Sequence, residues 1–316
     1  MDKSESSFCF QQIHIDAARN STDDFNPFHD PHKYQDIQGN PYSGTIVLGF
    51  QLECLVEYQV NLYRDAHEEQ GFIQEHGLHF SNYQLTFANA LLPGEQFWVE
   101  IKPTKIKADP PSLSNRVIVR KNDSMVIIGY RRETANPIYV PTNDDIMMAE
   151  SMPENQLQSV ADTRFYLKRK YISAGNAKNF TAGSLCDQYY YFDVLENRVN
   201  YPSMYPCSLA SCALLEKAIK ESYDFLGNPM VYMSHNISVD QRLARSLCTN
   251  EELRIVVNGP KIISGEKGLG KSELTRQLFC CLGLIRENLP LYYAEVYMAP
   301  LAAIVNSKAT LQLPMF

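Results

Sequence analysis

Apolar and polar positions along the chain follow two periods, one typical of helices and one typical of strands. Residues 49–63 carry apolar side chains three and four positions apart, and this spacing predicts an amphipathic helix. Runs typical of strands follow at residues 79–87, 97–106, 114–120 and 125–131. The first half of the sequence therefore predicts a helix followed by an antiparallel meander.

The same order of elements recurs in the second half. Residues 204–216 correspond to residues 46–58 and predict a second helix, and further strand-like runs lie at 230–239, 253–263, 273–282 and 291–299. The stretch between the halves is rich in turn formers and acids and shows no sustained periodicity. We therefore predict two repeats, at residues 1–135 and 163–316, joined by a linker at 136–162.

Composition limits the classes of partner. The 316 residues carry a formal net charge of −7, which gives no basic surface for nucleic acid or an anionic membrane. The longest nearly apolar run, residues 278–285, is too short to span a bilayer, and no signal peptide is read at residues 1–20. Eight scattered cysteines without a CxxC pair are typical of buried, reduced thiols. We expect a soluble cytoplasmic protein that binds neither nucleic acid nor membrane.

The candidate chemistry lies in the segment Asp24-Phe25-Asn26-Pro27-Phe28-His29, which precedes the first predicted helix. A water held between a carboxylate and an imidazole can be deprotonated by one and oriented by the other. The Asn-Pro pair makes a stiff turn, because proline fixes its own φ and restricts the residue before it. Gly49, at the predicted helix start, can offer its N–H to a thioester oxygen where enolate charge develops. The pattern indicates addition of water to, or its removal from, an activated C=C bond.

These residues, followed by Ile46-Val47-x-Gly49, resemble the signature of the MaoC-like (R)-specific enoyl-CoA hydratases and dehydratases. The resemblance implies an α+β double hotdog fold, with a long helix wrapped by an antiparallel sheet in each repeat. It implies catalytic roles for Asp24, His29 and Gly49, and substrate contacts from residues around them, namely Asn26, Leu48 and Phe50. Asp23 and Leu48 depart from the family pattern, which usually has glycine before the aspartate and often histidine or proline before Gly49.

The two repeats differ in their chemistry. Where the second repeat should present an acid and a histidine, residues 180–188 contain no histidine, and His235 lies far downstream on a predicted strand. We therefore expect one active dyad per chain and a degenerate second half. The halves are expected to pair as an intramolecular pseudo-dimer that removes exposed sheet edges, and a further homodimer stays open.

The resemblance implies action on 2-enoyl or 3-hydroxyacyl thioesters in fatty acid metabolism, with CoA or acyl-carrier protein carried on the substrate. It requires no metal and no redox cofactor. Two alternatives remain at this point. A hotdog acyl-thioesterase would use a carboxylate or amide near the helix start, such as Gln51 or Glu53. A non-catalytic acyl-thioester binding or partner protein would retain its ligand without turnover.

One further motif points elsewhere. Residues 265–272 match the phosphate-loop pattern GxxxxGK[ST]. Such a loop needs a parallel sheet and a following helix, whereas the residues after it alternate with the period of a strand. We expect a hairpin between two strands and no nucleotide site.

Overall fold

The computed structural model describes residues 7–151, 164–263 and 275–305. In the first half, the central helix α2 (Gly49–Ala66) follows the short helix α1 (Gln12–Thr22) and two 3-10 turns, η1 (Pro27–His29) and η2 (Tyr34–Asp36). The remaining first-half elements are one short helix and six strands: α3 (Gln70–Glu75), β1 (Phe8–Cys9), β2 (Phe80–Phe87), β3 (Gln96–Ile101), β4 (Lys105–Ala108), β5 (Pro111–Lys121) and β6 (Ser124–Thr134).

The second half has the corresponding central helix α7 (Met204–Lys220), preceded by α5 (Ala174–Gly183). Its other elements are two short helices, a small hairpin and five long strands: α6 (Gln188–Tyr191), α8 (Gln241–Arg245), β8 (Phe192–Asp193), β9 (Arg198–Val199), β7 (Phe165–Tyr171), β10 (Met230–Asp240), β11 (Glu252–Ile263), β12 (Arg276–Ile285) and β13 (Leu289–Pro300).

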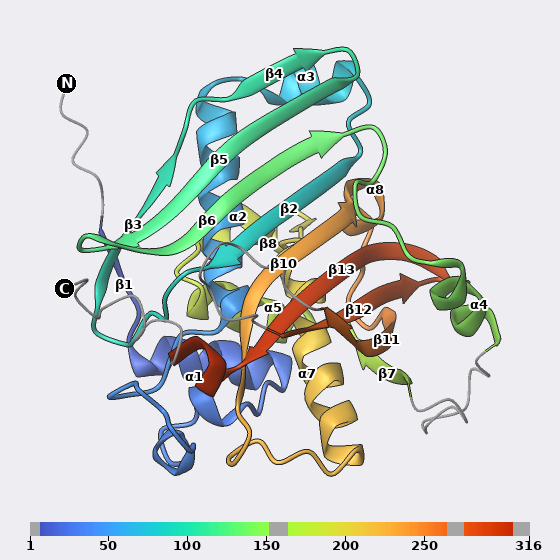
Figure 1. Cartoon of the computed structure of the whole chain (residues 1–316). Helices are drawn as coiled ribbons and strands as arrows, with labels where there is room; N and C mark the ends of the chain where they lie inside the picture. The colour runs from blue at the N-terminus through green and yellow to red at the C-terminus, as the bar shows by residue number, and fades with distance from the viewer. Residues whose placement is uncertain (1–6, 152–163, 264–274, 306–316) are drawn as a thin grey trace, which may run out of the picture.

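One curved sheet runs through both halves (Figure 1). Its order is β1-β3-β5-β6-β2-β10-β13-β12-β11-β7, with β4 pairing on β5. The order reads the same from either edge when the halves are exchanged, so an approximate two-fold axis lies between β2 and β10. These strands pair antiparallel from Thr86 opposite Ser234 to Phe80 opposite Asp240. The pairing buries an edge that each half would otherwise expose.

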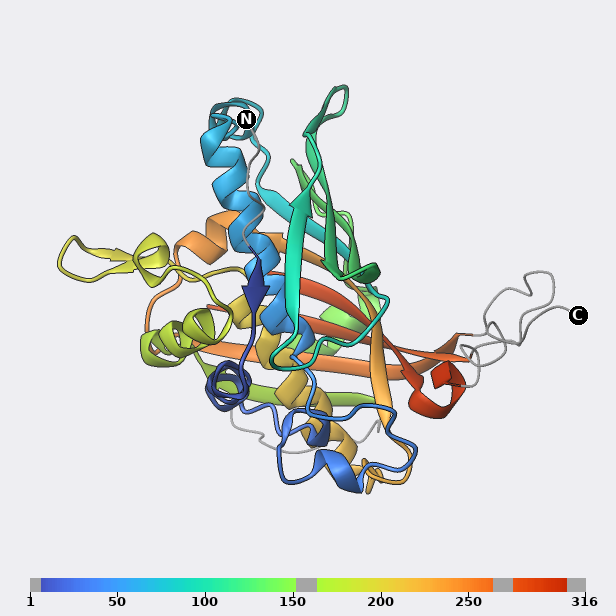
Figure 2. The ribbon, with the colours of Figure 1, turned by 90° about the vertical axis from the view of Figure 1, so that its left-hand side faces the viewer.

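Both central helices pack on the same face of this sheet (Figure 2). Leu55 and Val56 of α2 and Leu209 and Ala213 of α7 belong to one buried apolar cluster with the inward-facing strand residues. The short helices α1 and α5 also contact each other. Burial of a few apolar side chains per turn, at about 1.5–3 kcal/mol each, is the main force that holds the helices on the sheet.

The chain departs from the expected elements in the linker. Within residues 136–162, α4 (Asn143–Ser151) is helical, although no periodicity pointed to a helix. Tyr139 and Met148 pack against Val256 and Leu282, which point away from the central helices. The linker therefore covers the outer face of the second half, and it does so through apolar residues too widely spaced to show a period.

Two smaller differences concern the strands. The predicted strand 97–106 is two strands, β3 and β4, and Pro103, which cannot donate to a ladder, lies between them. The glycine-rich run 265–272 lies outside the described residues. Its flanking strands β11 and β12 pair antiparallel, from Arg254 opposite Leu284 to Ile263 opposite Arg276, so a strand follows it where a phosphate loop requires a helix.

Within the described ranges, none of the helices combines the length and the apolar character needed to cross a bilayer.

Candidate active site

The motif loop leaves the end of α1 through an unusual backbone conformation. Asp23 caps the helix with φ 54°, in the left-handed region that glycine adopts most easily. This conformation explains why glycine would suit the position. The Asp23 carboxylate pairs with Lys170 on β7 of the second half, so its charge is balanced outside the motif.

Side chain to backbone hydrogen bonds fix the turn that follows. Asp24 Oδ1 accepts from the Asn26 N–H at 3.1 Å, and Asn26 Oδ1 accepts from the Phe28 N–H at 3.1 Å. Pro27 then begins the 3-10 turn η1, where its fixed φ fits and its missing N–H costs nothing. The loop is held by its own side chains, and these hydrogen bonds fix the position of His29.

His29 is buried, and its tautomer is set by the backbone. Its Nδ1 lies 2.7 Å from the carbonyl oxygen of Ile46, a distance at which Nδ1–H donates, so the neutral ring carries its lone pair on Nε2. Burial lowers the pKa of His29 below its ordinary value of 6.5, while the nearby Asp24 carboxylate opposes that shift. His29 is therefore a neutral proton acceptor at neutral pH, with a negative charge close enough to stabilise its protonated form.

Gly49 begins α2 close to the end of β2. A Cβ at this position would lie 3.1 Å from Phe87 Cζ and 3.4 Å from Tyr232 Cδ2, so a larger residue would press on both rings. Among the described residues, no carboxylate accepts from the Gly49 N–H. The helix dipole favours negative charge at this end of α2.

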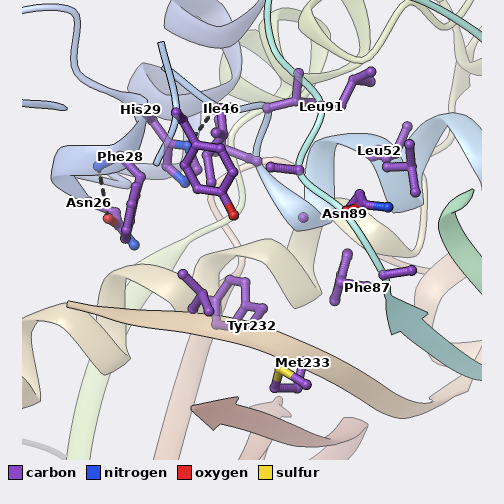
Figure 3. Close-up of a pocket in the computed structure, with 18 of the residues that line it drawn as sticks. Asn26, Phe28, His29, Ile46, Leu52, Phe87, Asn89, Leu91, Tyr232 and Met233 are labelled. Atoms are coloured by element: carbon purple, nitrogen blue, oxygen red, sulfur yellow. Dashed lines mark hydrogen bonds between the residues drawn. The ribbon is translucent and has the colours of Figure 1, made fainter. Parts of the chain in front are cut away.

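A cavity of about 300 Å³ lies between the motif loop, the start of α2 and the second half. Figure 3 shows His29 and Ile46 on one side of it, and Tyr232 and Met233 of β10 on the other. Its wall is mostly apolar. The lining residues are Asn26, Phe28, His29, Tyr42, Ile46, Val47, Leu48, Gly49, Leu52, Phe87, Ala88, Asn89, Ala90, Leu91, Val126, Met230, Val231, Tyr232, Met233, Met298 and Ile304.

The residues singled out from the sequence fall into two groups. His29, Gly49, Asn26 and Leu48 all line this cavity. Asp24 is buried and is not among the lining residues, and its charge raises the pKa of His29 against the effect of burial. Phe50 points into the core and stacks on His235, with ring centroids 4.6 Å apart, and does not line the cavity, whereas its neighbour Leu52 does.

A contribution of the second half to this cavity was expected from the pairing of the halves, but no motif identified the residues that make it. Met230, Tyr232 and Met298 belong to strands that no motif marked. An adjoining cavity of about 200 Å³ shares all three, and it continues past Phe225 toward the C-terminal end of α7. Only the pairing of β2 with β10 brings these residues beside the motif loop.

The two residues considered for a thioesterase are engaged elsewhere. Gln51 Nε2 donates to the carbonyl oxygens of His14 and Gly183, which ties α2 to α1 and α5. Both Glu53 carboxylate oxygens lie within 3.1 Å of His235 Nδ1 in the fully buried interior. Neither side chain lines the cavity.

Comparison with known proteins identifies the fold. No family model and no curated protein matches the sequence. Among solved structures, a putative MaoC domain protein dehydratase from Chloroflexus aurantiacus is similar with a TM-score of 0.58 and 8% identity, covering 93% of each chain. A conserved hypothetical protein of Mycobacterium tuberculosis that has a double hotdog fold matches with a TM-score of 0.54 and 10% identity, covering 94% of each chain. This chain has a double hotdog fold.

A third similar structure is a MaoC-like dehydratase, with a TM-score of 0.53 and 9% identity over 95% of this chain and 96% of that one. The expected α+β double hotdog is thus confirmed along almost the whole sequence. At such low identity the likeness concerns the fold, so the chemistry has to be argued from the cavity itself.

Proposed function

We propose that this protein is a hydratase or dehydratase of 2-enoyl and 3-hydroxyacyl thioesters. One observation carries the proposal. The buried His29 is held through Nδ1 by the Ile46 carbonyl, and it borders an apolar cavity that also receives Gly49 at the start of a helix. A proton acceptor and a donor for a developing oxyanion thus share one cavity, as this reaction requires.

The proposed hydration begins with a water at His29 Nε2. As Nε2 takes a proton, the water oxygen bonds to C3 and the C2=C3 electron pair moves toward the thioester carbonyl. Gly49 N–H stabilises the enolate oxygen that forms, and the Asp24 charge stabilises the protonated imidazole. Transfer of that proton to C2 completes the addition of water. Delivery from one wall of the cavity would give a single product configuration, which we propose is (R).

The apolar lining supports an acyl chain as the bound group. Leu48, Leu52 and Phe87 surround the first cavity, and Phe28 and Tyr232 lead into the adjoining one. We propose that longer chains extend into the adjoining cavity over the second half. The carrier would be CoA or acyl-carrier protein, and the reaction as written needs neither a metal nor a redox cofactor.

The test is turnover of crotonyl-CoA and of a longer 2-enoyl-CoA, followed by loss of enoyl absorbance, with chiral analysis of the 3-hydroxyacyl product. We expect hydration of at least one of them to an (R)-product. Release of free thiol without hydration would instead identify a thioesterase. Retention of the acyl-CoA through gel filtration, with neither reaction, would identify a binding protein and refute the proposal.

A further inference from the structure

A separate, polar cavity of about 400 Å³, here named the second cavity, lies at the position that corresponds to the candidate active site in the other half of the fold. The symmetric strand order carries the end of β2 onto the end of β10, and the start of β10 onto the start of β2. The second cavity is accordingly lined by Gln241 after β10, Ser81 of β2 and Ser203 before α7. The same fold position therefore holds a hollow in each half.

Its wall contains a buried charge network. Glu133 Oε1 accepts from Arg131 Nε at 2.9 Å and from Arg64 Nη1, and Glu133 Oε2 accepts from Ser81 Oγ at 2.6 Å. Burial alone would raise the pKa of Glu133, but Arg131 and Arg64 hold it below its ordinary value. The Glu133 carboxylate is thus ionised, and both of its oxygens are occupied.

The start of α7 corresponds to the start of α2 at Gly49, and the Glu57 side chain of α2 binds it. Its two carboxylate oxygens accept from the backbone N–H groups of Ser203 and Met204, each at 2.9 Å. These N–H groups begin α7, so a carboxylate of the chain itself takes the position where a thioester oxygen would bind. The second cavity cannot repeat the proposed chemistry of the first.

Among the described residues, three donors of this cavity's lining residues lack a hydrogen-bond partner, namely Arg64 Nη2 and the hydroxyls of Tyr191 and Tyr201. Arg64 is 1% exposed, and its Nη2 makes no hydrogen bond; Tyr191 is 4% exposed, and its hydroxyl makes none. Both residues line the cavity. A buried donor without a partner is destabilising, and more so when it is charged, so a group of such donors around one cavity points to a missing ligand.

The charge of the wall indicates what would satisfy them. Arg64 and Arg131 balance Glu57 and Glu133 in the buried wall, and the exposed Arg245 at the edge adds one positive charge. Burial raises the pKa of the Tyr191 hydroxyl well above its ordinary value, so this group stays protonated and donates. Guanidinium and phenol donors together suit a carboxylate or phosphate oxygen.

We propose that the second cavity is a binding site for a small anion bearing a carboxylate or phosphate group, held by Arg64 Nη2 and the Tyr191 hydroxyl. The site is separate from the thioester cavity, and it does not depend on the proposed enzyme activity. Helix α2 connects the two, with Gly49 at one cavity and Glu57 and Arg64 at the other.

The test is a thermal-shift and calorimetric titration of the full chain with inorganic phosphate, acetate, malonate and citrate, at constant ionic strength set by chloride. A ligand that binds only the folded protein raises Tm in a saturable manner. We expect saturation by at least one of these anions, and the series separates a phosphate site from a carboxylate site.

Tyr191→Phe is the decisive variant, because it removes an unbonded hydroxyl and leaves the ion pairs intact. We expect it to weaken anion binding by about tenfold or more. The matched control is Tyr292→Phe, which removes another buried, unpartnered hydroxyl that does not line this cavity, and it should bind as the wild type does. Arg64→Lys should also weaken binding while keeping a charge beside Glu133. Absence of saturation with all four anions, or equal affinity in Tyr191→Phe and the wild type, would show a cavity filled by water and overturn the proposal.

Discussion

The two halves have a cavity at corresponding positions, but one is lined mostly by apolar side chains and the other by polar and charged ones. In the first half, the start of α2 opens onto apolar side chains, and among the described residues no carboxylate accepts from the Gly49 N–H. In the second half, Glu57 takes up the N–H groups of Ser203 and Met204 at the start of α7. Each hotdog repeat thus places the N-terminus of a helix beside a cavity. A single side chain from the other central helix decides whether the N–H groups at that N-terminus are free to bind a ligand.

The difference extends to the groups around each helix start. The first cavity has one titratable base, His29, whose burial keeps it neutral. The second has two buried arginines that share Glu133. A neutral base in an apolar wall can move a proton, whereas a buried arginine stays charged and can only bind. The comparison therefore supports the proposals of turnover at the first cavity and of anion binding at the second.

Removal of the base should give the largest effect. His29→Ala takes away the proposed proton acceptor, so hydration should fall by about a hundredfold to ten-thousandfold in a protein that still folds. The measurement is the rate of enoyl absorbance loss at saturating crotonyl-CoA. His32→Ala, in the exposed part of the same loop, is the matched control and should keep the wild-type rate. Equal hydration rates in the two variants would show that His29 is not the proton acceptor.

Disruption of the second cavity's ion pairs should affect stability rather than the chemical step. Glu133→Gln leaves Arg64 and Arg131 buried without their shared carboxylate, which should lower the free energy of unfolding by about 3–5 kcal/mol. Urea denaturation would measure the loss. Glu95→Gln breaks the more exposed pair with Lys121 and should cost no more than about 1 kcal/mol. Equal losses in the two variants would mean that the buried network is no more important than a surface pair.

The pH dependence tests the titration of His29 at the first cavity. Because burial lowers the pKa of His29, the acid limb of kcat/KM should lie below pH 6.5. Asp24 opposes this shift, so Asp24→Asn should lower the rate and also move the limb to lower pH. The unfolded chain binds a proton at His29 first as pH falls. The stability that neutral His29 contributes is therefore complete above pH 6.5 and lost as pH falls through its folded pKa. A limb that moves upward in Asp24→Asn would contradict the coupling.

The sequence predicted what depends on local spacing. Helix α2 begins at Gly49 as expected, and strands β5, β6 and β10 each contain the run predicted for them. These elements follow from periodicity and turn formers, which act over a few residues. The motif likewise placed His29, because the Asn-Pro turn closes through neighbours in the chain.

What the sequence did not reveal depends on residues far apart in the chain. Tyr232 reaches the first cavity only because β10 pairs with β2. Glu57 looked like one polar position on a helix, and its role appears only where α2 meets the start of α7. Phe50 carried the same apolar signal as Leu52, yet one faces His235 and the other the cavity. Periodicity identifies a buried face without saying which part of that face borders a hollow.

The smallest expected effect tests the helix start itself. In Gly49→Ala, the new methyl group would lie 3.1 Å from Phe87 Cζ and 3.4 Å from Tyr232 Cδ2, so these rings must shift by a few tenths of an ångström. Displacement of the thioester from the N–H by this amount should lower kcat/KM by about tenfold, since catalysis is sensitive to such changes in position. The stability should change by less than about 1 kcal/mol, because alanine is the better helix former.

Gly44→Ala is the control for this variant, since its new methyl group meets only Leu92 Cδ2 at 3.9 Å and should leave the kinetics unchanged. The dependence of the loss on acyl chain length distinguishes two explanations of a lower kcat/KM in Gly49→Ala. If the Gly49 N–H polarises the thioester, the loss should appear with short and long enoyl-CoA alike, because both present the same carbonyl. A loss confined to long chains would show that the methyl group only narrows the acyl path. The free helix start would then have no catalytic advantage over the one that Glu57 occupies.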